Sequence, residues 1–410
     1  MVSLSTPYEA PRDKWRTLLL LSLAELLAMS VWFSASAVVP ALTDAWQLND
    51  SGKAWLTMSV QIGFVAGALG SSALTLADRI PSRQFFAISA LLAALATALI
   101  PLFVTSLAPA LVLRFLAGMV LAGVYPVGMK IMTTWTREDR GLGIGLLVGA
   151  LTVGSASPHL VNAVGGIGDW RLAMYFAAGS ALLGGVIAFV FVEEGPYRSP
   201  SPRLSLTHLR DILRARDVML ANLGYLGHMW ELFAMWSWMH AFLLASFERS
   251  GVGEAWASAT TFAVIGAGGL GSLAAGILAD RVGRTTITIA SLGVSGTCAV
   301  GIGFLYGDSP AALSCVAILW GITVVADSAQ FSACVTELAE RKIVGTALTL
   351  QTSLGFLLTL VTIRLLPVVE DAVGWEWAFA FLALGPLVGI WAMLTLRRAD
   401  SAVQLASGRR

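Results

Sequence analysis

The chain has 410 residues, of which 57% are hydrophobic and 12% are charged, and its formal net charge is +1. Soluble domains carry about 25% charged residues, so this composition excludes an ordinary soluble protein. The near-neutral balance also excludes a basic surface for nucleic acid. The three cysteines lie in apolar stretches without metal-ligand spacing. We therefore expect no disulfide framework, no metal site and no bound cofactor.

Twelve stretches reach or approach the roughly 20 apolar residues that cross the hydrocarbon core of a bilayer. The predicted spans are 17–41, 53–77, 84–104, 108–133, 141–164, 171–193, 217–246, 257–279, 285–306, 310–335, 345–368 and 375–397. The first stretch is too long for the apolar region of a signal peptide and lacks a small-residue cleavage site, so we expect it to remain as a helix. The sequence thus predicts an all-α membrane protein with twelve transmembrane helices.

The long polar interruption at 194–216 divides the spans six plus six and is typical of a cytoplasmic linker. We predict an N-terminal six-helix bundle at 17–193 and a C-terminal one at 217–397, flanked by a segment at 1–16 and a tail at 398–410. The two ends, the linker and the loops on their side hold 20 of the 26 lysines and arginines. The positive-inside rule therefore places both termini in the cytoplasm. Composition and the lack of a recognisable eukaryotic targeting signal favour a bacterial inner membrane.

An internal repeat links the two bundles. Residues 25–32 and 231–238 agree at five of eight positions, and the shared Glu, Ala, Met and Trp are spaced i, i+3, i+4 and i+7. That spacing forms one stripe of an α-helix. A carboxylate in an apolar span costs about 2.5–3.5 kcal/mol on insertion scales, so Glu25 and Glu231 should face a protein interior or a water-filled cavity. The alternative is that both are neutral, hydrogen-bonded residues that hold the bundle together.

Three further matches start at offsets of 202 to 205 residues: 77–83 with 279–284, 140–143 with 342–345, and Trp170 with Trp375. Six helices repeated in the same orientation are the parallel-repeat pattern of transporters whose halves rock around a site near the midplane. The sequence therefore predicts two pseudo-symmetric six-helix halves.

Motifs at these positions resemble those of a known family. Residues 276–284 (Gly-Ile-Leu-Ala-Asp-Arg-Val-Gly-Arg) resemble the loop motif between helices 8 and 9 of the major facilitator superfamily, and Arg114-Phe-Leu-Ala-Gly118 resembles its helix 4 signature. The resemblance covers essentially the whole chain. The first-half loop departs from the pattern at Leu74 and at Pro81-Ser82, and Ser155 stands where drug/proton antiporters have proline.

The resemblance implies that spans 1, 4, 7 and 10 line a central cavity. Six ionisable residues other than histidine lie clearly within the spans, and five of them are on these four helices: Glu25, Arg114, Lys130, Glu231 and Asp327, with Arg364 on span 11. Charges are rare within membrane spans and usually face the bundle interior, so this placement favours a polar cavity.

Glu25 and Glu231 are the first candidates for proton coupling, because a carboxyl group in a closed cavity can load a proton on one side of the membrane and release it on the other. His228 lies three residues before Glu231 on the same helical face, so a His–Glu relay is one interpretation and a packing histidine is the other. Asp327, with Gln330 three residues later, is either a polar patch of the cavity or an interhelical hydrogen-bonding group.

Two basic residues of span 4 allow different interpretations. Arg114 needs a partner, and we consider an ion pair with Glu25 or direct binding of an anionic solute. Lys130 is near the cytoplasmic end, where snorkelling is expected.

Aromatic and thioether side chains share the repeated stripe. Met29, Trp32, Met235 and Trp238 are predicted to form a cavity wall that suits flat, amphipathic or cationic solutes. The alternative is that they are packing or lipid-facing residues.

The two loop motifs are cytoplasmic gates by resemblance. Their residues are Asp78, Arg79 and Arg83 in the first half and Asp280, Arg281, Gly283 and Arg284 in the second. Asp78 is expected to pair with Arg83 and Asp280 with Arg284, holding the outward-open state. The alternative, that the arginines only fix topology, leaves the aspartates unexplained.

We expect a monomeric secondary transporter, not an enzyme, because no span carries a metal-ligand cluster or a nucleophile elbow. It should move a small organic solute by alternating access, with protons as the coupling ion and with the bilayer as its solvent. An amphipathic or cationic solute is favoured by the acids and aromatic rings. The alternatives are a small anion bound through Arg114, or a non-transporting membrane sensor on the same fold.

Overall fold

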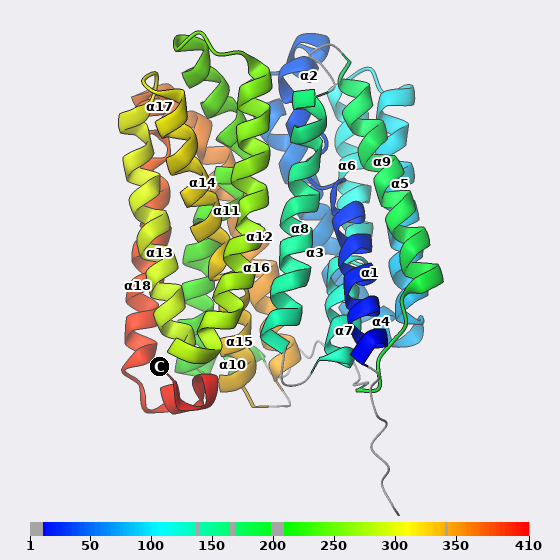
Figure 1. Cartoon of the computed structure of the whole chain (residues 1–410), viewed down its shortest axis with the longest axis vertical. Helices are drawn as coiled ribbons and strands as arrows, with labels where there is room; N and C mark the ends of the chain where they lie inside the picture. Colours follow the sequence, from blue (N-terminus) through cyan, green and yellow to red (C-terminus); the bar gives the residue numbers. More distant parts are fainter. Residues whose placement is uncertain (1–10, 137–139, 165–168, 198–208, 341–342, 410) are drawn as a thin grey trace, which may run out of the picture.

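The computed structural model describes residues 11–136, 140–164, 169–197, 209–340 and 343–409. Within these ranges the chain is helical and contains no strand. The long helices lie roughly along one axis, in two bundles that follow one another in the sequence (Figure 1). This confirms the predicted all-α architecture.

The first bundle begins with a broken helix. Its elements are α1 (Pro11–Met29), η1 (Ser36–Val38), α2 (Val39–Trp46), α3 (Asp50–Ala73), α4 (Leu76–Arg79), α5 (Ser82–Phe103), α6 (Leu107–Leu121), α7 (Tyr125–Trp135), α8 (Arg140–Val164) and α9 (Trp170–Phe191).

The second bundle follows the same plan. Its elements are α10 (Leu209–Arg214), α11 (Arg216–Arg249), α12 (Glu254–Val282), α13 (Arg284–Gly301), η3 (Ile302–Leu305), α14 (Pro310–Ala326), α15 (Ser328–Leu338), α16 (Val344–Val373), α17 (Trp375–Ala378), η4 (Ala380–Ala383), α18 (Leu384–Arg397) and η5 (Asp400–Gly408). The end of the molecule that holds α10 and η5 is called the α10 side below, and the opposite end the α2 side (Figure 1).

Ten helices in the described part of the chain are long and apolar enough to cross a membrane. The two other expected spans correspond to α1 with its continuation through η1 and α2, and to α11. The first is interrupted, because α1 ends at Met29 and turns follow. The helix α11 has 34 residues but carries Glu231 and two histidines, which lower its mean hydropathy. The twelve-helix prediction is therefore close but not exact.

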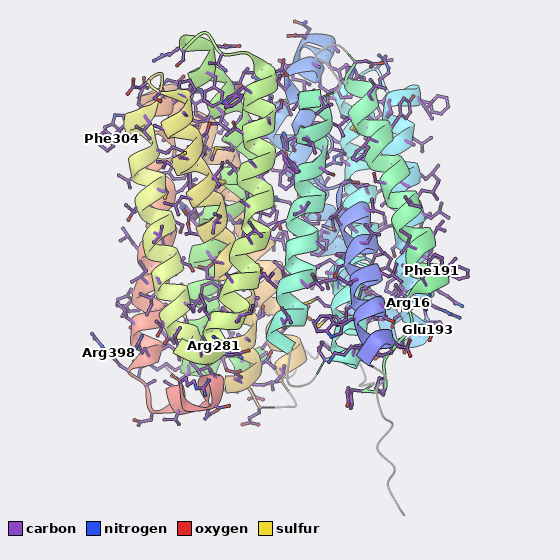
Figure 2. All side chains as sticks on the ribbon, in the orientation of Figure 1. Arg16, Phe191, Glu193, Arg281, Phe304 and Arg398 are labelled. Carbon is purple, nitrogen blue, oxygen red and sulfur yellow. The ribbon has the colours of Figure 1, made fainter. Side chains whose placement is uncertain are left out.

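Apolar and charged side chains occupy separate parts of the surface, as a bilayer requires. Phe191 and Phe304 are 47% and 70% exposed on the outer face of the bundles. Arg16, Arg281 and Arg398 lie at the α10 side (Figure 2). An apolar perimeter with charged groups at the helix ends suits lipid around the middle and water at the ends.

The two halves meet chiefly along α8 and α12, which run side by side, and along α3 and α16 (Figure 1). Glycines allow the contact between α8 and α12, since a Cβ atom on Gly149 would lie 3.4 Å from the carbonyl oxygen of Gly269. Small residues let membrane helices approach closely. The centre of the molecule is therefore bounded by helices from both halves.

Candidate functional site

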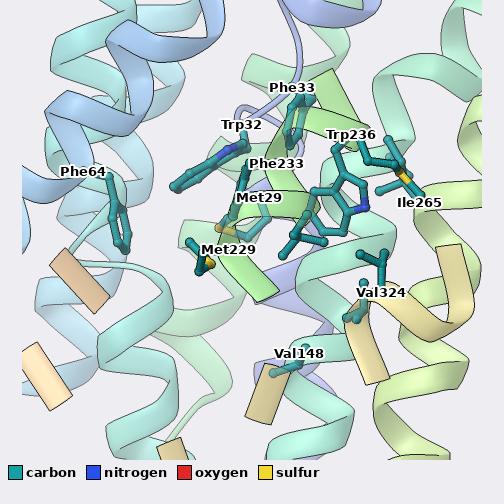
Figure 3. Packing of buried hydrophobic residues seen from close by; sticks show 14 of the residues in the cluster. Met29, Trp32, Phe33, Phe64, Val148, Met229, Phe233, Trp236, Ile265 and Val324 are labelled. Atoms are coloured by element: carbon teal, nitrogen blue, oxygen red, sulfur yellow. The ribbon is translucent and has the colours of Figure 1, made fainter. Parts of the chain in front are cut away.

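Four aromatic rings meet where the two halves face each other. Trp32 follows α1, and Phe64, Phe233 and Phe356 lie on α3, α11 and α16. The ring centroids of Phe64 and Phe356 are 4.8 Å apart, and Trp32 lies 5.1 to 6.0 Å from the other three. Figure 3 shows Met29 beside Phe233 and Trp32, two rings of this four-ring cluster. Aromatic pairs at these separations attract beyond simple burial, so the cluster joins the halves at the centre.

The predicted wall residues do not all lie together. Trp32 and Met29 lie in or beside the four-ring cluster, and the Trp32 indole nitrogen has no hydrogen-bond partner. Trp238 instead donates its indole N–H to the carbonyl oxygen of Ile363 at 3.0 Å, and Met235 is fully buried. The repeated stripe therefore has different surroundings in the two halves. The three other rings of the cluster, Phe64, Phe233 and Phe356, were not among the predicted wall residues, because phenylalanine in an apolar span gives no distinguishing signal.

Glu25 is fully buried, and within the described part of the chain neither of its carboxylate oxygens has a hydrogen-bond partner. Its Oε2 faces α7 at Gly128, where an added Cβ atom would lie 2.6 Å away. Tyr125, one turn before that glycine, is close enough for electrostatic interaction with Glu25. A buried carboxyl group without partners is energetically costly.

Glu231 has the opposite environment. Its two oxygens accept hydrogen bonds from Ser295 Oγ at 2.9 Å and from Trp320 Nε1 at 2.6 Å. These donors come from α13 and α14, which are in the same half as α11. Glu231 therefore fits the structural interpretation of a buried, hydrogen-bonded acid, while Glu25 does not.

His228 pairs with Asp327. The His228 Nδ1 atom lies 2.9 Å from Asp327 Oδ1, and both side chains are 1% exposed. His228 therefore pairs with Asp327 and not with Glu231, its predicted relay partner, because the Glu231 carboxylate points to α13 and α14. Asp327 lies at the break between α14 and α15, which brings it to α11. The His228 Nε2 atom has no hydrogen-bond partner.

Two tyrosines connect the acids of the two halves. Tyr125 lies near Glu25 and near Tyr225. The Tyr225 ring lies 5.9 Å from the His228 ring, measured between centroids. Ionisable side chains thus extend from α1 and α7 across the interface of the halves to the His228–Asp327 pair.

The Arg114 side chain is bound by backbone groups of the first bundle. Its guanidinium donates to the carbonyl oxygens of Val31 at 2.8 Å and Leu56 at 3.4 Å, to Ser34 Oγ at 3.1 Å, and to the carbonyl oxygen of Trp32. The predicted ion pair with Glu25 is wrong. The reason is the break after α1, which leaves carbonyl groups that a buried donor must satisfy. Because these contacts occupy the guanidinium, it is not presented to an anionic solute.

The family model of the Major Facilitator Superfamily matches residues 21–363. The chain belongs to the Major Facilitator Superfamily. The protein is therefore a membrane transporter by family and not an enzyme.

Individual relatives match shorter segments. NiaP of Bacillus subtilis, which is named a niacin/nicotinamide transporter, is 34% identical over 128 residues, or 31% of each chain. The 4-hydroxybenzoate transporter PcaK of Pseudomonas aeruginosa is 29% identical over 216 residues, which cover 52% of this chain and 45% of PcaK. The chain thus matches less than half the length of either curated relative.

Solved structures match over nearly the full length. The human organic anion transporter MFSD10 has a TM-score of 0.69 at 16% identity, and the nucleoside transporter NupG a TM-score of 0.70 at 15% identity. Each comparison covers 93% of this chain and 99% of the other. At such low identity the likeness shows the superfamily fold alone.

The second-half loop motif forms a connected ion network at the α10 side. Arg284 lies 3.5 Å from Asp280, as predicted, but its shorter contact is 2.6 Å to Glu337 of α15. The Asp280 carboxylate also faces Gly141 at the start of α8 in the other half, where an added Cβ atom would lie 2.9 Å from Oδ2. Gly283 has a φ of +100°, which glycine adopts without steric cost. Glu337 was missed because the motif itself does not contain it.

The first-half loop has its charges arranged differently. Asp78 forms an ion pair with Lys130 of α7 at 2.8 Å, so Lys130 is a partner in the loop and does not merely snorkel. Arg79 and Arg83 line a cavity of about 710 Å³ beside this pair. In the first half the acidic loop residue Asp78 contacts a base on α7, while in the second the basic residue Arg284 contacts an acid on α15.

Replacing Glu337 with glutamine should loosen the α10 side, because Arg284 loses its shortest charged contact. Cys334 is fully buried one turn before Glu337. The rate at which a maleimide alkylates Cys334 therefore measures how often the α10 side opens. In a Cys298→Ser, Cys315→Ser background we expect about tenfold faster labelling, since a charge-assisted contact contributes roughly 1.5–3 kcal/mol. Glu248→Gln at the opposite end is the control. An unchanged labelling rate in Glu337→Gln would show that the network does not hold this side closed.

A pocket of about 390 Å³ lies between the halves at the α2 side. It is called the α2-side pocket below. Its lining comes from α2, α3, α11 and α16 and includes Asp44, Asp50, Lys53, Trp238, His240 and Glu370. Helices from both halves thus enclose one pocket on the side opposite the ion networks.

Proposed function

We propose that the protein is a proton-coupled secondary transporter that moves a small planar organic solute across a bacterial inner membrane by alternating access. In this proposal the α10 side faces the cytoplasm. The observation that carries it is the position of the four-ring cluster between the halves, with buried ionisable groups beside it. Alternating access requires a site that both halves share, and this cluster is shared by α3, α11 and α16 and by the segment after α1.

The rings favour a flat solute. A planar ring can insert between aromatic faces and edges at little entropic cost, and a cation gains further from the ring quadrupole. Met29 and Met229 lie near the cluster (Figure 3) and can adapt to irregular shapes. These features support a neutral or cationic planar compound.

Buried acids support coupling to protons. Glu25 has no hydrogen-bond partner, and the His228–Asp327 pair can exchange a proton between an imidazole and a carboxylate. Glu231 is bound by two donors, so we give it a positioning role in the second half. Coupling is therefore proposed for Glu25 and for the His228–Asp327 pair.

An aromatic carboxylate is the second candidate solute. It is favoured by the names of two relatives, one a niacin/nicotinamide transporter and the other a 4-hydroxybenzoate transporter. Arg114 does not support this alternative, because its guanidinium is occupied by backbone carbonyl groups. The free Nε2 atom of His228 is the donor that such an anion would use.

Three solutes with one pyridine ring and different charges test the proposal: neutral nicotinamide, anionic nicotinate and cationic N-methylnicotinamide. Their uptake is measured in proteoliposomes of purified protein with and without a pH gradient. We expect uptake of the neutral or the cationic solute, and we expect Glu25→Gln to abolish the effect of the pH gradient on that uptake. The control is Glu193→Gln, which replaces an exposed acid at the α10 side. Gradient-driven uptake of nicotinate alone would favour the second candidate, and unchanged gradient dependence in Glu25→Gln would refute its coupling role.

A further inference from the structure

Two histidines from opposite halves face each other near the α2 side. His159 lies on α8 and His240 on α11, with their ring centroids 5.6 Å apart and their planes tilted by 42°. The side chains are 1% and 4% exposed, and none of the four ring nitrogens has a hydrogen-bond partner among the residues that the structure describes. A neutral imidazole carries one donor and one acceptor, and leaving both unpaired in a buried place is unfavourable. The histidine pair therefore has unused capacity to bind a ligand.

The α2-side pocket leads to this pair, because His240 lines it. The same lining contains four carboxylates, from Asp44, Asp50, Glu248 and Glu370, and one cation, Lys53. Lys53 forms an ion pair with Asp50 at 2.8 Å, so the lining has an excess of negative charge. A concave surface with one sign of charge raises the local concentration of the opposite ion. The pocket thus favours a positively charged ligand.

We propose that His159 and His240 bind one proton between them, taken from the compartment that the α2-side pocket faces, and so form a proton-loading site of the transport cycle. The proton binds the lone pair of a ring nitrogen of one histidine, and a small rotation lets the new N–H donate to a ring nitrogen of the other. This inference rests on the proton coupling proposed above. It assigns a place where the proton is bound before it reaches Glu25 or the His228–Asp327 pair.

The proton would also tie the halves together. His159 belongs to the first half and His240 to the second, so a shared proton adds a hydrogen bond across the interface that must open during alternating access. A second proton would place like charges on both rings and separate them. The contact is thus strongest when the pair holds one proton.

The surroundings contain no ion pair that already uses these nitrogens. Asp44 of α2, Asp50 and Lys53 of α3, Glu248 of α11 and Glu370 of α16 line the pocket together with His240. On α12, Glu254 accepts from Asn162, which lies three residues after His159, at 3.5 Å. Among the described residues, none of these groups forms a hydrogen bond with a ring nitrogen of the pair. In this the pair differs from His228, whose Nδ1 faces Asp327.

Imidazole nitrogen-15 NMR of the full-length protein in lipid nanodiscs tests the site without any solute. The chain has only four histidines, so the signals can be assigned with single His→Asn variants. We expect the two imidazoles to take up one proton jointly between about pH 4 and pH 6.5, because burial disfavours a charged imidazole. His159→Asn and His240→Asn should each remove the joint step and one bound proton, while His208→Asn should leave both in place.

Folding is checked by the retained His228 signal and by His→Gln versions of both variants. Two imidazoles that stay neutral throughout this range would overturn the inference. The inference would also be overturned if, in each single variant, the remaining histidine of the pair titrated as it does in the unaltered protein. Zinc chloride provides a further arm: a pair that does not titrate but shifts both signals on adding Zn²⁺ would be a metal site, which also overturns the proton assignment.

Uptake of the three pyridine solutes under a pH gradient separates this inference from the proposed function. Joint titration together with gradient-independent uptake would support the histidine pair and refute proton coupling of transport. Gradient-driven uptake without joint titration would support the coupling and refute the pair as its loading site.

Discussion

Arg114→Gln should strongly destabilise the protein and abolish transport. The guanidinium satisfies the carbonyl oxygens of Val31, Trp32 and Leu56 in a fully buried place, and glutamine cannot reach all of them. The Val31 and Leu56 carbonyl oxygens keep a second donor, from Ser34 and Ser59, and the Trp32 carbonyl oxygen loses the donor that Arg114 supplies. A hydrogen bond from a charged donor contributes about 1.5–3 kcal/mol, so we expect a loss of about 2–4 kcal/mol in the free energy of unfolding. Thermal unfolding of the purified variant in nanodiscs measures the change.

Arg364→Gln is the matched control, because Arg364 lies on α16 with an exposed side chain. Its unfolding temperature should stay close to that of the unaltered protein. Equal unfolding temperatures for both variants would mean that the break after α1 does not depend on the Arg114 side chain. Retained stability with lost transport in Arg114→Gln would instead move this residue from the scaffold to the transport mechanism.

Gly118→Ala and Gly321→Ala should each disrupt the packing of one half. An added Cβ atom would lie 2.0 Å from the carbonyl oxygen of Val60 in the first case and 1.9 Å from that of Val264 in the second. Both contacts are to backbone, so the helices themselves must move. Overpacking of this kind costs about 1–3 kcal/mol or more, and we expect a clearly lower unfolding temperature for each variant.

Gly179→Ala and Gly293→Ala are the controls, because an added Cβ atom at either position has no neighbour within 4 Å. Alanine favours a helix over glycine by about 1 kcal/mol, so these two variants should be neutral or slightly stabilised. A similar loss of stability in all four variants would refute the close-contact explanation. Gly118 and Gly321 are 203 residues apart, so similar losses in both would show that the repeat preserves packing as well as sequence.

The repeat preserved the backbone plan but not the partners of the acids. Glu25 and Glu231 are equivalent in sequence, yet one faces Gly128 without a hydrogen bond and the other accepts from Ser295 and Trp320. A central site needs asymmetry, because the two halves bind different parts of one solute. The unpaired acid is therefore the better candidate for coupling.

The sequence by itself determined the all-α membrane fold, the two related halves and most of the spans. These properties follow from apolar length, helical periodicity and repeated motifs, all of which are local along the chain. It also predicted that Glu25, Trp32, His228 and Asp327 lie in the interior, because polar or aromatic groups in apolar spans stand out.

Only the tertiary structure decided which of these groups meet. His228 finds Asp327 and not Glu231, Arg114 finds the carbonyls after α1 and not Glu25, and His159 finds His240 on the other half. Such pairs depend on the rotation of each helix about its axis and on where a helix breaks. Neither is encoded in the spacing of residues along the chain, because every face of a membrane helix is largely apolar and many rotations satisfy the same pattern.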